Sequence, residues 1–121
     1  MSQITTHVLD TAAGRPAAGL GVALYRQLGT GSDDNSGSGW EELAMGTTDA
    51  DGRVADLLDP DTVLGAGCYR MHFATGPYLK QSVGTAFYPW VDVVFHIGAG
   101  GEHYHIPLLL SPFGYSTYRG S

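Results

Sequence analysis

The sequence predicts an all-β fold, an antiparallel β-sandwich of seven to eight short strands with one short helix. Two observations support this prediction. Short segments alternate between apolar and polar side chains, which is the period of a strand that buries one face. Clusters of Gly, Pro, Asp and Ser separate these segments, as turns do between the strands of a sandwich.

The first half of the chain contains three alternating segments, residues 3–10, 20–28 and 40–48. Gly14–Ala17 is predicted to be a turn between the first two strands. Gly29–Gly39 is rich in Gly, Ser and Asp and predicts a flexible hairpin loop. Asp49–Arg53 predicts a tight turn in which Gly52 adopts a positive φ.

The second half contains four more predicted strands, residues 67–74, 91–97, 103–111 and 115–118. Between the first two, Gly76–Gly84 carries a proline near its start and a run long enough for about two turns of helix. Ser111–Gly114 supplies turn residues, so the last two strands are predicted to form a hairpin.

Length and composition narrow the class of protein. The 121 residues predict a single domain over residues 1–121. A net charge of -6 with six Lys and Arg argues against nucleic acid, and the lack of a basic run argues against an anionic membrane surface. We expect a cytoplasmic protein, since neither a leader nor a transmembrane stretch is evident. Cys68, the single cysteine, excludes a disulfide framework and is predicted to be a small buried hydrophobe.

The last long strand has an unusual outer face. His103 and His105 project from it beside Pro107, whereas the opposite face is plainly apolar. This spacing alone fits either two zinc ligands or two surface histidines. The proline has no local explanation, because within a sheet it removes a ladder hydrogen bond.

The positions of the other histidines indicate less about function. His72 and His96 lie opposite the apolar faces of their strands, which indicates surface or hydrogen-bonded side chains. His7 cannot be placed against the His103–His105 pair from spacing.

Four segments together resemble the 5-hydroxyisourate hydrolases, the enzyme branch of the transthyretin family. They are His7–Asp10, Thr48–Arg53, Phe87–Pro89 and Tyr118–Ser121. The C-terminal Tyr-Arg-Gly-Ser is the most specific of them, because the hormone-carrying transthyretins lack it.

This resemblance implies a transthyretin-like sandwich that hydrolyses 5-hydroxyisourate to 2-oxo-4-hydroxy-4-carboxy-5-ureidoimidazoline in urate degradation. It also implies a homotetramer built as a dimer of dimers, with sites where the dimers meet, and no metal or other cofactor. The catalytic residues carried over are His7, Arg53, His105 and Ser121. The substrate-binding residues carried over are His7, Arg53, Tyr118 and Arg119.

These residue types suit the implied reaction. Hydrolysis of a ring amide needs a base that works near neutral pH, as imidazole does. A planar guanidinium, from Arg53 or Arg119, suits the carbonyl oxygens of an oxidised purine and the developing oxyanion. Tyr118 could stack on a flat heterocycle, and Ser121 offers a hydroxyl and the terminal carboxylate.

Two other functions stay open at this point. A transthyretin-like carrier would bind small aromatic ligands in the same channel and would not need the C-terminal motif. A metal protein would use His103 and His105 as zinc ligands.

Overall fold

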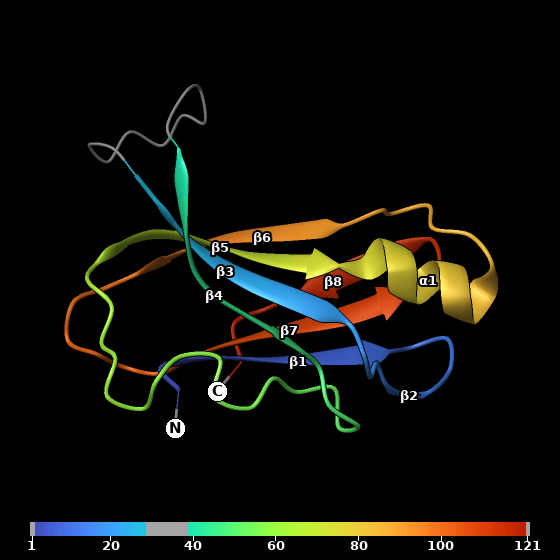
Figure 1. Ribbon diagram of the computed structural model, residues 1–121, viewed down its shortest axis with the longest axis horizontal. Helices are drawn as coiled ribbons and strands as arrows, with labels where there is room; N and C mark the ends of the chain where they lie inside the picture. The colour runs from blue at the N-terminus through green and yellow to red at the C-terminus, as the bar shows by residue number, and fades with distance from the viewer. Residues whose placement is uncertain (1, 29–38, 121) are drawn as a thin grey trace.

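The computed structural model, which describes residues 2–28 and 39–120, consists of two four-stranded sheets packed face to face (Figure 1). The strands are β1 (Ile4–Asp10), β2 (Arg15–Pro16), β3 (Gly21–Gln27), β4 (Trp40–Thr47), β5 (Gly67–Ala74), β6 (Val91–Ile97), β7 (Tyr104–Ser111) and β8 (Gly114–Thr117). One sheet has the order β2-β1-β7-β8 and the other β4-β3-β5-β6. The predicted sandwich with one short helix, α1 (Thr75–Val83), is confirmed. The loop predicted over 29–39 lies, apart from Gly39, outside the described residues.

The core lies between the two sheets and follows the alternation of the strands. Ile4 and Val8 of β1 and Leu108 of β7 have no exposed surface, and Met71 and Phe73 of β5 face them from the other sheet. Burying each such side chain stabilises the fold by about 1.5–3 kcal/mol. The alternation of apolar and polar residues in the sequence therefore predicted correctly which side chains of the strands face the core.

The segment between β4 and β5 also contributes to the core, although it forms no strand. Its buried side chains are Val54, Leu57, Leu58 and Leu64. Hydrophobic periodicity misses them, because an irregular segment has no period to detect.

Three details differ from what the sequence patterns indicate. β1 pairs with β7 in parallel, whereas the other pairs are antiparallel, and alternation carries no information about strand direction. The predicted turn at Gly14–Ala17 contains the short strand β2, which pairs with Leu9 and Asp10. Cys68 is half-buried rather than buried, because it lies opposite His96 on the outer side of its sheet.

The register of β7 explains how Pro107 is tolerated inside a sheet. The carbonyl groups of Pro107 and His105 point toward β8, since they accept hydrogen bonds from Thr117 Oγ1 at 2.6 Å and from the Gly120 N–H at 2.9 Å. The β8 ladder ends at the pair of Leu108 with Thr117. The missing N–H of Pro107 therefore falls just past the end of that ladder.

Helix α1 is fixed at one end of the sandwich (Figure 1). The Tyr78 hydroxyl donates to Asp10 Oδ2 at 2.7 Å, and burial together with this carboxylate raises the pKa of Tyr78 to about 12. Gly84 ends the helix with a φ of 83° and an N–H donated to the Lys80 carbonyl.

Within the described chain, no helix has the length and apolar character needed to cross a membrane.

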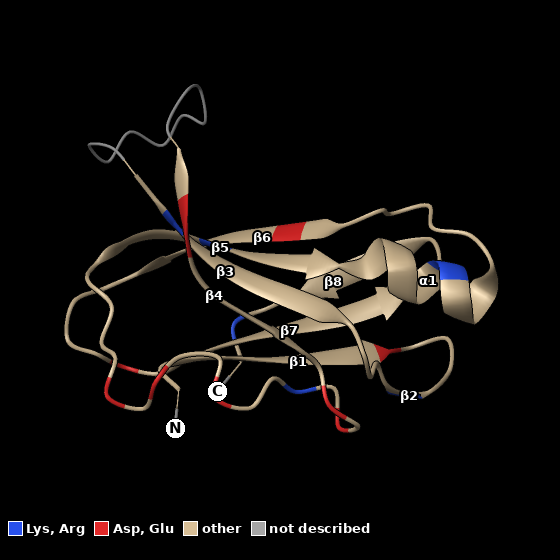
Figure 2. Cartoon of the chain, viewed as in Figure 1, with Lys and Arg blue, Asp and Glu red and all other residues tan. Residues whose placement is uncertain are grey.

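The six Lys and Arg residues are distributed along the described chain. They lie on β2, β3, β5 and α1, between β4 and β5, and after β8 (Figure 2).

Thr48 connects β4 to the turn that follows it. Its buried hydroxyl donates to the Ala17 carbonyl at 2.7 Å and accepts from the Leu20 N–H at 2.9 Å. The backbone of Thr48 also exchanges hydrogen bonds with Gly19 and Leu20. The start of the Asp49–Arg53 turn is therefore fixed to the beginning of β3.

Replacing Thr48 with Val should lower the free energy of unfolding by about 2–4 kcal/mol, because two buried backbone groups lose their partner. Chemical denaturation measures this loss. Thr47→Val is the matched control, since Thr47 is the exposed neighbour, and it should change stability by less than about 0.5 kcal/mol. Equal effects of the two substitutions would contradict this role of the Thr48 hydroxyl.

Candidate active site

The Asp49–Arg53 turn lies directly against β1. The Val8 N–H donates to the Gly52 carbonyl at 2.8 Å, and a Cβ on Gly52 would lie 2.3 Å from the Val8 carbonyl oxygen. Gly52 has a φ of 77°, as the sequence predicts for this turn. The Asp49 carboxylate accepts the Arg53 N–H at 3.1 Å. Arg53 forms an isolated β-bridge with His7 of β1. The turn therefore pairs with β1 next to β2, which pairs with Leu9 and Asp10.

The parallel pairing of β1 with β7 brings the two ends of the chain together. Thr5 lies opposite His105, and His7 lies opposite Pro107. Paired residues point to the same face of a sheet, so His7 and His105 share the outer face. The structure thus places His7, which sequence spacing alone could not do.

The Thr5 hydroxyl joins the two histidines of β7. Its Oγ1 lies 2.8 Å from His103 Nε2 and 2.8 Å from His105 Nδ1. The two rings are nearly parallel, with 6.4 Å between their centroids. A hydroxyl has one proton, so Thr5 donates to one ring and accepts from the other. The tautomers of His103 and His105 are therefore coupled.

Sequence reasoning did not identify Thr5 as a site residue. The sequence contained only a weak indication: Thr5 lies two residues before His7 and therefore shares the polar face of the strand with it. Its partner across the sheet depends on the parallel register, which the sequence does not reveal.

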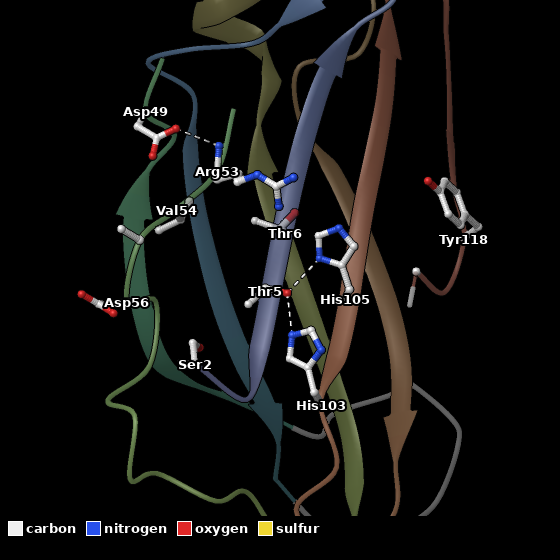
Figure 3. A pocket seen from close by; sticks show the side chains of 12 residues that line it. Ser2, Thr5, Thr6, Asp49, Arg53, Val54, Asp56, His103, His105 and Tyr118 are labelled. Atoms are coloured by element: carbon white, nitrogen blue, oxygen red, sulfur yellow. Dashed lines mark hydrogen bonds between the residues drawn. The ribbon is translucent and has the colours of Figure 1, made fainter. Parts of the chain in front are cut away.

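A cavity of about 570 Å³ lies over this face of the sheet. Its lining residues include Thr5, Arg53, His103, His105, Tyr118 and Gly120. Figure 3 shows the Arg53 side chain extending past Thr6 toward His105, with Tyr118 on the other side of the histidine. A cation, an imidazole and an aromatic ring therefore meet at one cavity.

His105 has an electrostatic environment suited to a base. Its burial, followed by the nearby charges of Arg53, His103 and His7, lowers its pKa below the ordinary value. The imidazole is consequently neutral near pH 7.

The C-terminal segment after β8 packs against His105. Gly120 donates its N–H to the His105 carbonyl at 2.9 Å, and the two residues form an isolated β-bridge. A Cβ on Gly120 would lie 2.5 Å from His105 Cδ2, closer than such atoms approach. Glycine is needed here because the imidazole occupies the space that a side chain would fill.

The structure brings together three of the six residues carried over from the resemblance. Arg53, His105 and Tyr118 line the cavity, while His7 lies beside them without lining it. Arg119 is not among the lining residues, and its guanidinium lies over the Tyr104 ring instead. The full set of six carried-over residues is His7, Arg53, His105, Tyr118, Arg119 and Ser121. Ser121 lies outside the described part of the chain.

The histidine pair was also a candidate for zinc. His103 and His105 each direct a ring nitrogen to Thr5. Among the described residues, no group of three or more His, Cys, Asp or Glu side chains could hold a metal ion.

The sequence matches the model of the HIUase/Transthyretin family over residues 4–120. The chain belongs to this family. A 5-hydroxyisourate hydrolase from Caulobacter vibrioides is 45% identical over 125 residues, with 100% of each chain covered.

Solved structures of both branches of the family are similar. The 5-hydroxyisourate hydrolase of Klebsiella pneumoniae has a TM-score of 0.77 and 35% identity, covering 98% of each chain. Transthyretin from Sparus aurata has a TM-score of 0.85 and 30% identity, covering 99% of this chain and 97% of that one. The backbone therefore does not separate the hydrolases from the transthyretins, and the side chains at the cavity have to do so.

Substituting Gly120 with Ala should displace either the C-terminal segment or the His105 ring. We expect the ring signals of His105 in NMR spectra to shift while the free energy of unfolding changes by less than about 0.5 kcal/mol. Gly114→Ala is the control, because a Cβ there would lie 3.5 Å from Ser111 Oγ, an ordinary contact. Unchanged His105 signals in the Gly120 variant would show that the segment does not pack against this ring.

Proposed function

We propose that the chain is a 5-hydroxyisourate hydrolase of urate degradation and that the cavity over β1 and β7 is its active site. The observation that carries the proposal is the meeting of Arg53 and His105 at one cavity, where burial and the neighbouring charges lower the pKa of the imidazole. The 45% identity to a 5-hydroxyisourate hydrolase over the whole chain supports the same activity. The product would be 2-oxo-4-hydroxy-4-carboxy-5-ureidoimidazoline.

His105 acts as the general base in this proposal. When its Nδ1 carries the proton and donates it to Thr5, the Thr5 hydroxyl donates to His103 Nε2. His105 Nε2 then keeps its lone pair and accepts a proton from a water molecule in the cavity. The hydroxide that forms adds to the ring carbonyl carbon of the substrate.

Arg53 stabilises the negative charge that develops on the carbonyl oxygen. Its planar, cationic guanidinium lines the cavity beside His105. The tetrahedral intermediate then collapses, the ring C–N bond breaks, and the leaving nitrogen takes the proton back from His105 Nε2. His105 returns to its neutral form, and the scheme uses no cofactor.

His7 and Tyr118 have supporting roles in the proposal. His7 lies next to Arg53 through their β-bridge and contributes to the lowered pKa of His105, so we assign it to the polar wall behind the reacting groups. Tyr118 lies at the cavity, where its ring can stack on a flat heterocycle. Ser121 stays a predicted catalytic residue, and the cytoplasmic location stays a prediction from the sequence.

A carrier function is the alternative that the backbone leaves open, because Sparus aurata transthyretin has the same fold. A site for an apolar aromatic ligand would be lined mainly by hydrophobic side chains. Here the wall carries Arg53 and two histidines, and the C-terminal segment packs against His105. These features support catalysis rather than transport.

Association of four copies is the assembly that we propose, as a dimer of dimers. β6 and β8 are edge strands with unpaired backbone groups. Phe87 and Phe113 are 63% and 71% exposed, with 6.0 Å between their ring centroids, and Tyr115 of β8 is 44% exposed nearby. An exposed aromatic cluster beside an open edge strand fits an interface between copies.

Analytical ultracentrifugation should find four times the mass of one chain. Phe113→Ser should shift the protein toward smaller species without unfolding it, because the ring is exposed in a single chain. Val63→Ser, at a 66% exposed valine elsewhere, should leave the mass unchanged. A monomer at micromolar concentration would contradict the proposed assembly.

The activity can be followed as the loss of ultraviolet absorbance of freshly generated 5-hydroxyisourate. A base works only in its neutral form, so kcat/KM should fall as the pH drops through the pKa of His105. Because that pKa is lowered, the midpoint should lie below the ordinary histidine value of 6.5. A profile that is flat between about pH 5 and 8 would remove a histidine base from the mechanism.

Arg53→Lys should lower kcat on the order of a hundredfold, because a point charge replaces the planar group that faces the oxyanion. Arg15→Lys is the control, since Arg15 is an exposed residue of β2 that does not line the cavity. If the Arg53 variant kept its activity within a few fold, Arg53 would not be the oxyanion group.

A further inference from the structure

Arg119 lies in the C-terminal segment but faces away from the cavity. β8 and the segment keep one register on β7, since Thr117 pairs with Leu108 and Gly120 with His105. Side chains alternate on such a segment, so Tyr118 and Gly120 face the cavity and Arg119 faces the opposite side.

Two side chains hold the Arg119 guanidinium there. Its Cζ lies 4.4 Å from the centre of the Tyr104 ring, within the range of a cation–π contact. Its NH2 group lies 3.3 Å from Glu102 Oε1. The Tyr104 hydroxyl donates to the same carboxylate oxygen at 2.7 Å, so the three side chains form one network.

Tyr104 and the backbone of Glu102 are held by several hydrogen bonds. Tyr104 is 6% exposed, its hydroxyl accepts the Gly98 N–H at 3.0 Å, and its own N–H donates to the Gln3 carbonyl at 2.9 Å. The Gln3 side chain also donates to the Glu102 carbonyl at 3.1 Å. Tyr104 and the backbone of Glu102 therefore keep a defined position against the residue that precedes β1.

We propose that Arg119, Glu102 and Tyr104 form a tail clamp, and that Arg119 is a positioning residue which holds Gly120 against the His105 ring. Arg119 then acts on the reaction through the placement of its neighbours Tyr118 and Gly120. This replaces the direct substrate contact that the resemblance implies for Arg119. The consequence for catalysis rests on the proposed hydrolase function, whereas the placement of the segment does not.

The clamp is charged under ordinary assay conditions. The hydrogen bond from Tyr104, and then the charge of Arg119, lower the pKa of Glu102 below its ordinary value. A carboxylate with a lowered pKa contributes its stabilisation above the ordinary value and loses it as the pH falls through the lowered one. The clamp should therefore hold at neutral pH and weaken only in acid, or at high salt because the pair is exposed.

Release of the segment should change His105 in a defined way. Burial is the largest cause of its lowered pKa, and Gly120 is part of what covers the ring. Without that cover, the pKa of His105 should rise toward the ordinary value. The acid limb of kcat/KM should then move to higher pH, which loss of a substrate contact would not cause.

The test compares Arg119→Gln, Glu102→Gln, the double variant and Arg119→Lys. Arg119→Gln should lower kcat/KM roughly 5- to 30-fold, because it removes the cation–π contact with Tyr104 and the exposed ion pair together. Glu102→Gln should lower it by about 2- to 5-fold, because it removes the ion pair and leaves the cation–π contact in place. The double variant should be no worse than the more affected single variant, since all three break one network. Arg119→Lys should recover most of the activity, and Arg26→Gln, which breaks the exposed pair with Glu41, should lose none.

Carboxypeptidase digestion without substrate gives a second readout that does not depend on the reaction. Both Gln variants should lose their C-terminal residues faster than the unsubstituted protein, because digestion requires the released segment. Loss of activity in Arg119→Gln with full activity and slow digestion in Glu102→Gln would overturn the clamp in favour of direct substrate contact. If the unsubstituted protein left 5-hydroxyisourate intact while digestion followed the prediction, the clamp would stand and the proposed reaction would fail.

Discussion

The parallel pairing of β1 with β7 is the constraint on which the rest of the site depends. It joins residues about a hundred positions apart and sets Thr5 opposite His105. A slip of one residue would turn each outer side chain of β1 into the core, where Ile4 and Val8 have no exposed surface. The apolar core therefore enforces the register, and the register places the polar groups of the cavity.

Two backbone contacts complete the site on this frame. The close approach of Gly52 to Val8 sets Arg53 beside β1, and the approach of Gly120 to His105 covers the imidazole from the other side. In both places a side chain would occupy space that is already filled. Burial and the neighbouring cation then act in the same direction on His105 and keep it neutral.

The sequence predicted the inward faces of the strands and the Asp49–Arg53 turn, because alternation and turn residues are local properties. It could not give the direction of β1 against β7, so Thr5 was missed and His7 was placed only by resemblance. Arg119 shows a different limit. The C-terminal motif indicates that Arg119 has a function, but it does not indicate the direction of the side chain. The alternation of side chains along the segment after β8 directs Arg119 toward Tyr104 and away from the cavity.

The most direct test of this account is the protonation of His105, followed by nitrogen NMR across pH. If His105 is the base, its pKa should lie below the ordinary value of 6.5, and its neutral form should carry the proton on Nδ1, facing Thr5. In Thr5→Val this preference for Nδ1 should disappear. A proton on Nε2 in the neutral ring, or a pKa at or above the ordinary value, would contradict the assignment of His105 as the base.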